Sequence, residues 1–391
     1  MKTPHCHPYP DYMNISELLT EEQNRLLGEA RRFVEEELEP SIADHYEAGT
    51  FPKEAIARMG EAHLIGSNLA GYGLPGYDEI SYGLIMRELE RCDSAFRSCA
   101  SVQGSLVMYP IAKYGSDEQK DTWLERLGKG SAIGSFALTE PQGGSDPGSM
   151  ETRAEDRGDH WLLSGEKRWV TNGTLCDVVL VWARTDDGVR GFLCPADTPG
   201  VKFRSINRKL SLRASASAEL SLDQVKLPKS AELPAARGLG AALNCLNQAR
   251  YGIVWGVIGA AEACYDEALS YAQERQLFQK KLSQFQMVQG KLADMTLAIS
   301  QGQLLALRLG QLKNAGQLLP GHVSLGKQGN VKAALEIART CRDILGANGV
   351  LLDYKTMRHA CNLETVFTYE GTHDIHRLVV GQQVTGKGAF S

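Results

Sequence analysis

The chain has 391 residues, and because single hydrophobic cores rarely grow to that size, we expect two or three packed units. Hydrophobic residues make up 43% and charged residues 23% of the sequence, which is typical of a folded protein and excludes an extensively disordered one. The formal net charge of −5 provides no overall positive field for nucleic acid, so an anionic ligand must be bound by local arginine, lysine or helix N-termini.

The sequence gives no sign of a membrane span, a secretion signal or a metal site. No stretch of 18 uncharged apolar residues occurs, and Met1–Pro10 lacks an apolar core, so we expect a cytoplasmic protein. The nine cysteines are scattered without a CxxC pair, which favours reduced, buried thiols over disulfides or zinc. The segment His5-Cys6-His7 carries metal-ligating side chains but no further ligand nearby, and no metal is predicted.

The first third of the chain has a helical pattern. From Glu17 to about Gly130, apolar residues recur at helical spacing, most clearly in Leu18–Leu38 and Ser81–Glu90, and Asp93–Ser94 interrupts the pattern. From Gly134 to about Pro234 the pattern changes to short apolar or alternating runs separated by turn residues, which indicates a small β domain. The runs that predict strands are Trp161–Leu163, Val178–Trp182, Gly191–Cys194 and Leu220–Val225.

Long helical patterns return after Gly238 and suit a helix bundle. They cover Leu243–Gln276, Gln284–Asn314, Ser324–Leu345 and a last segment around Ile375–Val384. An apolar stripe in the first of them is more simply bundle core or subunit interface than a cofactor-binding face. We therefore predict a mostly α fold with a central β domain, divided into an N-terminal helical domain (1–133), a β domain (134–238) and a helical domain (239–391).

Taken one at a time, the local motifs are weak. The loop Gly143-Gly144-Ser145-Asp146 has the composition of a phosphate or flavin cradle, but such loops are mostly plain turns. No GxGxxG opens a βαβ unit, which argues against a Rossmann domain. His373 and His376 lie three residues apart without an HExxH pattern, so a metal role is not expected. Glu370 alone would be interpreted as a solvated or paired carboxylate.

Five strings taken together are far more specific. They are FALTEPQGGSD (136–146), WVTN (169–172), RQLF (275–278), DILGANG (343–349) and YEGT (369–372). In this order and at these separations, over nearly the whole chain, the sequence resembles the acyl-CoA dehydrogenase family. The resemblance implies an α-helical N-terminal domain, a middle β-barrel and a C-terminal four-helix bundle. It also implies a homotetramer that binds FAD between its subunits.

The resemblance also implies a site, residue by residue. Glu370 would be the base that removes the α-proton of an acyl-CoA, while a hydride leaves the β-carbon for FAD and the electrons pass to an electron-transfer flavoprotein. The implied FAD-binding residues are Phe136, Leu138, Thr139, Ser145, Trp169, Thr171, Arg275, Phe278, Gln286, Asp343, Ile344, Leu345, Gly346, Ala347 and Thr372. The implied substrate-side residues are Arg97, Ser98, Ser101, Ser145, Arg250, Tyr369 and Gly371.

Two departures from the family pattern concern the adenosine end of the cofactor. Gln279-Lys280-Lys281 stands where the family usually has Gly-x-Pro, and Gly346-Ala347 replaces its glycine pair. The first departure is expected to alter a loop, and the second adds a methyl group close to a cofactor surface. Neither affects the end of the site where the chemistry occurs.

One stretch resembles the glutaryl-CoA dehydrogenase subgroup of the family. It covers Arg87–Gln103, and the segments 211–215 and 369–376 share the likeness. The resemblance implies that Arg97 receives the distal carboxylate of a dicarboxylyl-CoA. Asp93 or Ser94 is expected to cap a helix whose N-terminus favours an anion, with Arg97 and Ser101 on one face. The alternative is that Arg97 only forms a structural ion pair with Glu90 or Asp93.

The resulting prediction is FAD-dependent oxidative decarboxylation of glutaryl-CoA to crotonyl-CoA and CO₂. The nearest alternative is a non-decarboxylating dehydrogenase, or an oxidase, that acts on another short or branched acyl-CoA. A flavin-bearing binding protein of the DNA-repair type is a second alternative. The absence of a basic domain and the presence of Glu370 in its motif argue against a nucleic-acid partner.

Overall fold

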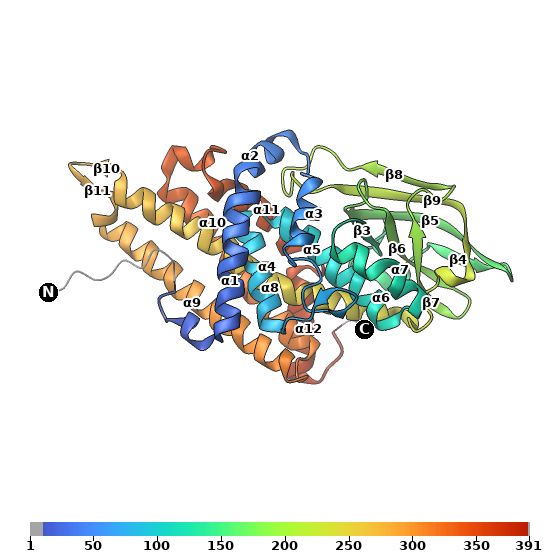
Figure 1. Ribbon diagram of the computed structural model, residues 1–391. Coiled ribbons are helices and arrows are strands. Elements are labelled where there is room, and N and C mark those ends of the chain that lie inside the picture. Colours follow the sequence, from blue (N-terminus) through green and yellow to red (C-terminus); the bar gives the residue numbers. More distant parts are fainter. Residues whose placement is uncertain (1–10, 390–391) are drawn as a thin grey trace.

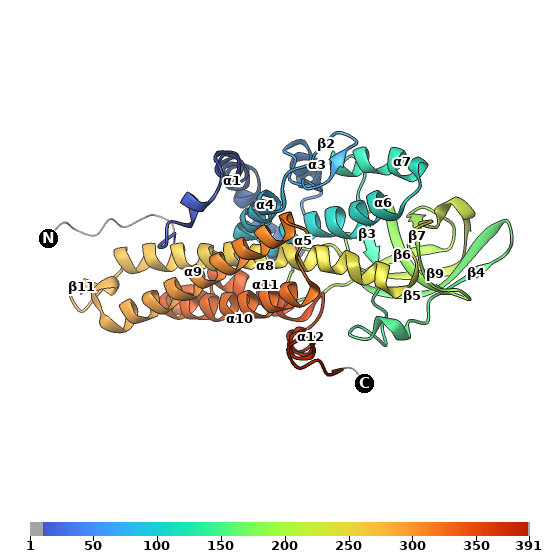
Figure 2. The same cartoon turned by 90° about the horizontal axis from the view of Figure 1, so that it is seen from below.

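The computed structural model describes residues 11–389, so His5-Cys6-His7 lies outside the described residues. Helices and a curled sheet form an elongated molecule, with the sheet at one end and the ends of three long C-terminal helices at the other (Figures 1 and 2). The mostly α fold with a central β region that the sequence predicted is confirmed. In the described part of the chain, no helix is both long and apolar enough to cross a membrane.

The N-terminal region is helical, and side-chain caps set many of its boundaries. Asp93 ends one helix and starts the next, because its backbone is extended and its carboxylate accepts a hydrogen bond from the Ala95 N–H, which confirms the predicted interruption and cap. The helical elements are η1 (Ile15–Leu18), α1 (Glu21–Phe33), η2 (Val34–Leu38), α2 (Glu39–Ala48), α3 (Glu54–Glu61), α4 (Glu79–Cys92), α5 (Ser94–Ser101), η3 (Val102–Met108), α6 (Tyr109–Tyr114) and α7 (Asp117–Gly128). A small hairpin of β1 (Ala70–Gly71) and β2 (Leu74–Pro75) precedes α4.

Seven strands form the sheet of the middle region, in the order β3-β6-β4-β5-β9-β8 with β7 beside β6. Strand β6 is buried along most of its length, which explains its unbroken apolar run. The four predicted strands all lie within β5, β6, β7 and β9. The strands are β3 (Gly134–Ala137), β4 (Arg153–Asp156), β5 (His160–Thr171), β6 (Val178–Thr185), β7 (Gly188–Pro195), β8 (Val201–Ser205) and β9 (Ser217–Pro228), with short helices η4 (Pro147–Ser149) and η5 (Lys229–Ala231).

In the C-terminal region the long helix α8 packs against α9, α10 and α11, and also against α4 of the N-terminal region. The elements are α8 (Gly238–Glu274), β10 (Gln276–Leu277), β11 (Lys280–Lys281), η6 (Leu282–Gln284), α9 (Gln286–Asn314), α10 (Pro320–Ile344), η7 (Gly346–Val350), α11 (Lys355–Thr368) and α12 (His373–Thr385). The predicted starts of α8 and α10 were several residues too late. Helix α11 was not predicted, because its buried face includes polar side chains such as Arg358 and Asn362 and therefore shows no apolar stripe.

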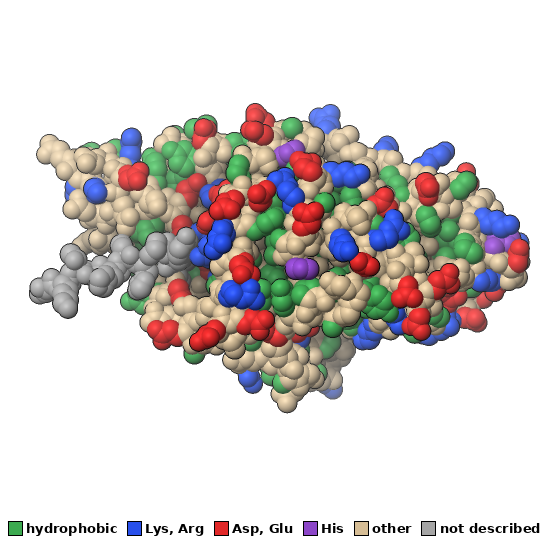
Figure 3. Space-filling model, in the orientation of Figure 1, with side chains coloured by type: hydrophobic (Ala, Val, Ile, Leu, Met, Phe, Trp, Pro, Cys, Tyr) green, Lys and Arg blue, Asp and Glu red, His purple; other side chains and the backbone are tan. Residues whose placement is uncertain are grey.

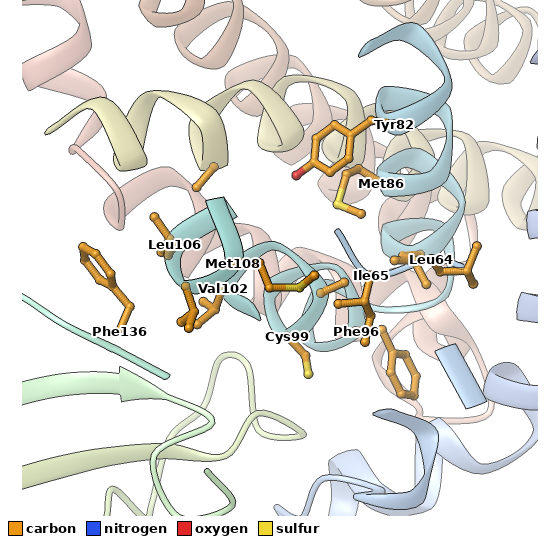
Figure 4. Packing of buried hydrophobic residues seen from close by; sticks show 14 of the residues in the cluster. Leu64, Ile65, Tyr82, Met86, Phe96, Cys99, Val102, Leu106, Met108 and Phe136 are labelled. Carbon is orange, nitrogen blue, oxygen red and sulfur yellow. The ribbon is translucent and has the colours of Figure 1, made fainter. Parts of the chain in front are cut away.

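The largest hydrophobic cluster joins the N-terminal helices and α8 to strands β3, β6 and β7, while the bundle and the sheet each have a further cluster. Side chains from α4, α5 and η3 pack together and reach Phe136 on β3 (Figure 4). The ring of Phe136 in turn packs against Trp182 on β6, with ring centroids 6.3 Å apart. Strand β3 and helix α5 are therefore held together, and they carry residues from both halves of the expected site.

Candidate active site

Glu370 lies in the four-residue turn, 369–372, between α11 and α12. The backbone is strained there, since Glu370 has φ 52°, a left-handed conformation that costs a non-glycine residue about 1–3 kcal/mol. Gly371 follows with φ 92°, and a Cβ at this position would lie 2.9 Å from His376 Nε2 and 3.3 Å from Arg250 Nη2. Thr372 then caps α12 through the Ile375 N–H. The turn therefore requires glycine at 371 and is fixed at both ends by helices.

The carboxylate of Glu370 meets the requirements of a base held away from bulk water. Its Oε2 atom is buried and makes no hydrogen bond within the described residues. Burial raises its pKa, and the positive charges of Arg97, Lys327 and Arg250 oppose that rise. A raised pKa brings a carboxylate closer in proton affinity to a carbon acid, as general-base catalysis requires.

Two buried cations hold the backbone of this turn. Lys327 on α10 donates to the carbonyl oxygens of Tyr369, at 2.6 Å, and of Gly371, at 2.7 Å. Arg250 on α8 donates from Nε to the carbonyl oxygen of Glu370, at 2.6 Å. Three successive carbonyl groups are thus turned toward cations on two bundle helices.

Arg97 is fully buried on α5, and the three nitrogen atoms of its guanidinium group have different surroundings. Its Nε donates to the Glu90 carboxylate at 2.6 Å, and its Nη2 donates to the hydroxyl of Tyr369. Among residues 11–389, neither its buried Nη1 nor the buried hydroxyl of Ser101, one helical turn further on, has a hydrogen-bond partner. The structural ion pair with Glu90 therefore exists, yet it leaves one donor of Arg97 unused beside the residue that precedes Glu370.

The start of α5 is capped by the carboxylate of Asp93, as the sequence predicted. The carboxylate of Asp93 already binds the Ala95 N–H there and forms an ion pair with Arg358 on α11, at 3.0 Å. Asn362 donates to the same carboxylate at 2.9 Å and accepts from the Leu212 N–H at 2.8 Å. This buried network fixes α5 to α11, the helix that leads into Glu370.

The residues expected near the flavin ring come together at β3 and β5. Phe136 and Leu138 are buried, whereas the Trp169 side chain is 55% exposed and its backbone has φ 61°. Lys167 is buried and donates to the carbonyl oxygen of Leu138, at 3.0 Å, and to the carboxylate of Glu140, at 2.8 Å. Ser145 lies in the exposed loop that follows, and Ser135 donates to the carbonyl oxygen of Thr171 at 2.6 Å.

The other expected FAD residues, apart from Thr372 at the start of α12, lie far away, at the tip of the bundle opposite the sheet (Figure 2). Arg275, Phe278 and Gln286 are exposed there, next to β10, β11 and η6. In 343–347 the side chains of Ile344 and Leu345 are buried in the bundle core, which leaves only their backbone for a ligand. Within one chain, these residues do not join the Glu370 site.

The backbone accommodates both departures from the family pattern, Gln279-Lys280-Lys281 and Gly346-Ala347. Phe278 and Gln279 form the tip of the β10–β11 hairpin with φ 50° and 63°, so a non-glycine residue occupies a left-handed position there. Of the pair 346–347, Gly346 has φ 62°, while Ala347 is exposed and is not in the left-handed region. The alanine therefore adds no backbone strain.

Comparison with known proteins agrees with this arrangement. Models of the N-terminal, middle and C-terminal domains of acyl-CoA dehydrogenase match residues 20–131, 135–225 and 236–385. The chain belongs to the acyl-CoA dehydrogenase family. Short-chain specific acyl-CoA dehydrogenase of Bos taurus mitochondria is 36% identical over 93% of this chain and 90% of that protein. A probable acyl-CoA dehydrogenase, YngJ of Bacillus subtilis, is 33% identical over 94% and 98%.

Solved structures within the family add a second kind of relative. A glutaryl-CoA dehydrogenase from Mycobacterium smegmatis, in complex with FADH2, is 49% identical with a TM-score of 0.97 over 98% of this chain and 100% of that one. Butyryl-CoA dehydrogenase from Megasphaera elsdenii is 29% identical with a TM-score of 0.90 over 94% and 99%. The family fold is therefore shared across enzymes named for different acyl groups.

Two residues of the site escaped the sequence reasoning. Lys327 occupies the buried face of α10, between Val323 and Val331, and a lysine inside an apolar stripe was the available signal. Gly256 on α8 leaves room for the ion pair, since a Cβ there would lie 2.1 Å from Glu90 Oε2 and 3.2 Å from Arg97 Cγ. No local pattern distinguishes that glycine from other small residues of α8.

Proposed function

We propose that the chain is an FAD-dependent dehydrogenase that converts glutaryl-CoA to crotonyl-CoA and CO₂. The observation that supports this substrate is the buried Nη1 of Arg97, which has no partner in the described part of the chain although Nε and Nη2 of the same side chain form hydrogen bonds. A buried unpaired donor on a cation is costly, so it favours an anionic ligand group at that point. The distal carboxylate of a dicarboxylyl-CoA has the required charge.

The residues of β3 and β5 fit an FAD ring, because the exposed aromatic side chain of Trp169 lies beside the loop that Lys167 holds in place. Phe136, Leu138, Thr139, Ser145 and Thr171 would complete that part of the site. Bound FAD would supply the acceptor for a hydride from the substrate β-carbon. The phosphate and adenosine end of FAD would be held by residues 343–347 and Thr372, together with Arg275, Phe278 and Gln286. The last three would come from a neighbouring subunit of a homotetramer.

In the first step, Glu370 takes the α-proton. A thioester α-proton is far less acidic than a carboxylic acid, and closing ten pK units of such a gap would take roughly 14 kcal/mol. Burial raises the pKa of Glu370, and hydrogen bonding of the thioester carbonyl to the Glu370 N–H would stabilise the developing enolate. This N–H makes no hydrogen bond within the described residues and is thus available to the substrate.

In the second step, the enoyl product loses its γ-carboxylate as CO₂. The bonding electrons pass into the conjugated thioester as a dienolate, and the proton on Glu370 returns to the γ-carbon, which gives crotonyl-CoA. Arg97 would hold the carboxylate for this step. Glu90 and Tyr369 occupy two of the donors of Arg97. Arg97 would therefore bind the substrate carboxylate less strongly, so that CO₂ can leave.

The alternative is a dehydrogenase for short acyl-CoAs that does not decarboxylate, and the mitochondrial short-chain relatives are the observation that favours it. The second alternative is a nucleic-acid-binding protein. The face shown in Figure 3 does not support it, because charges of both signs are intermixed there. Electron-transfer flavoprotein is the electron acceptor we propose, and the cytoplasmic location remains a prediction.

A panel of acyl-CoAs tests the proposal. Under anaerobic conditions, glutaryl-CoA should bleach the bound flavin faster than butyryl-CoA and branched acyl-CoAs at equal concentration. Bleaching by butyryl-CoA at the highest rate, with glutaryl-CoA inactive, would support the short-chain alternative. Reoxidation of the reduced protein by electron-transfer flavoprotein and not by oxygen would distinguish a dehydrogenase from an oxidase.

A further inference from the structure

We propose that Lys327 is a positioning residue that orients the Glu370 peptide so that its N–H faces the substrate carbonyl. The inference rests on the proposed role of Glu370 and identifies what holds that residue in its working conformation. Lys327 is 2% exposed and lies on the bundle-facing side of α10. It forms no ion pair within the described residues, and its hydrogen bonds are those to the carbonyl oxygens of Tyr369 and Gly371.

The geometry of the peptide unit links this contact to the chemistry. In a planar trans peptide, the carbonyl of one residue and the N–H of the next point in opposite directions. Because Lys327 binds the Tyr369 carbonyl oxygen at 2.6 Å, the Glu370 N–H must point away from the lysine. That N–H is the donor that the substrate thioester carbonyl would accept from.

Lys327 and Arg250 together also stabilise the strained backbone of the turn. Without them the left-handed φ of 52° at Glu370 would relax, because Lys327 and Arg250 donate the short hydrogen bonds to the carbonyl oxygens of 369, 370 and 371, at 2.6 to 2.7 Å. Burying an ammonium group among carbonyls is costly, and burial lowers the pKa of Lys327 to about 7. An amine at this position keeps donor hydrogens in either protonation state, so it holds the carbonyls across that pKa.

The direct test measures the substrate carbonyl itself. In the Glu370→Gln background, which prevents turnover, the infrared stretch of a ¹³C-labelled butyryl-CoA thioester carbonyl should lie below its solution value when bound. Adding Lys327→Met should return the stretch toward the solution value. If the Met variant does not fold, Lys327→Gln, which lacks the charge and has a shorter reach, should give a smaller return in the same direction. An unchanged stretch in the folded variant would overturn the proposal.

Kinetics provide the second readout, in the chain that retains Glu370. Lys327→Met should retain FAD but reduce its flavin with butyryl-CoA about 100-fold more slowly, the scale of losing one oxyanion-hole donor. Lys313→Met on α9 is the matched control, because Lys313 is a mostly buried lysine that pairs with Glu79, away from the turn. It should lower stability and leave the carbonyl stretch unchanged. A rate for Lys327→Met equal to that of the control would contradict the inference.

The pH profile separates positioning from simple loss of stability. The positive charge of Lys327 lowers the pKa of Glu370, so Lys327→Met should move the rise of the flavin-reduction rate to higher pH, and an unmoved profile would count against the inference. The groups that face Glu370 from the packed elements are Glu90 on α4, Arg97 on α5, Arg250 on α8, Lys327 on α10 and His376 on α12, together with Tyr369 of its own turn. If Glu370→Gln still reduced flavin, the proposed role of Glu370 as the base would be wrong. The infrared measurement would still test the role of Lys327 independently.

Discussion

Replacing Arg97 by methionine should reduce activity on glutaryl-CoA much more than on butyryl-CoA. The change removes one charge-assisted contact to the distal carboxylate, worth about 1.5–3 kcal/mol, or roughly 10- to 150-fold in kcat/KM. Butyryl-CoA has a methyl group in place of that carboxylate, so its kcat/KM should change much less. The assay is steady-state turnover of both substrates with an artificial electron acceptor, reported as the ratio of the two kcat/KM values.

The structure also predicts a cost in stability. Glu90 is fully buried, and without Arg97 its one remaining hydrogen bond among the described residues is that from the Ser94 hydroxyl, at 2.7 Å. Breaking a buried ion pair from one side costs about 3–5 kcal/mol, and the double variant Arg97→Met with Glu90→Gln should recover part of it. Arg358→Met, which breaks the buried pair with Asp93, is the matched control and should lower turnover of both substrates by the same factor. Equal losses on both substrates in Arg97→Met would refute the role of Arg97 in substrate selection.

Four further predictions concern the base, its turn and the cofactor. Glu370→Gln should retain FAD and lose nearly all flavin reduction in stopped-flow traces, and near-normal reduction would assign the base elsewhere. Because the pKa of Glu370 is raised in the folded protein, its contribution to stability is present at low pH and is lost as the pH rises above about 4.5. The melting temperature of Glu370→Gln, relative to that of the unmodified protein, should therefore increase as the pH is raised above that value. A difference in melting temperature that does not change with pH would contradict the pKa shift. Gly371→Ala should lower the melting temperature and flavin reduction, because its Cβ would meet His376 and Arg250, whereas normal activity would show that the turn tolerates a side chain. The purified protein should be a yellow tetramer, and Arg275→Ala should lose FAD on gel filtration, whereas a colourless monomer that rejects FAD would contradict the shared site.

Much of the fold followed from periodicity, since the strands and the long bundle helices have regular apolar patterns. Helix α11 did not, because its buried face carries Arg358, His359 and Asn362, whose partners lie far away in sequence. The cap at Asp93 was predictable from residue type alone, but its second role, binding Arg358, depends on tertiary packing. Local pattern therefore predicted elements and missed the polar contacts that join them.

The candidate site shows the same division. The strained turn at Glu370 could be located from its motif, yet the donors that hold it come from α8 and α10, more than 40 residues away in sequence. The pairing of Arg97 with Glu90 was one of two readings of their spacing, and the structure contains that pair together with an unused donor. The sequence therefore predicted the residues proposed to react, and only the folded chain shows what positions them.

The central claim is that glutaryl-CoA is both oxidised and decarboxylated. The direct measurement is incubation of the purified protein and an electron acceptor with glutaryl-CoA labelled with ¹⁴C in its distal carboxyl group, followed by trapping of CO₂ and chromatography of the acyl-CoA products. The proposed function predicts one labelled CO₂ for each crotonyl-CoA formed. Accumulation of labelled glutaconyl-CoA with no labelled CO₂ would contradict decarboxylation, and no oxidation of glutaryl-CoA at all would contradict the substrate.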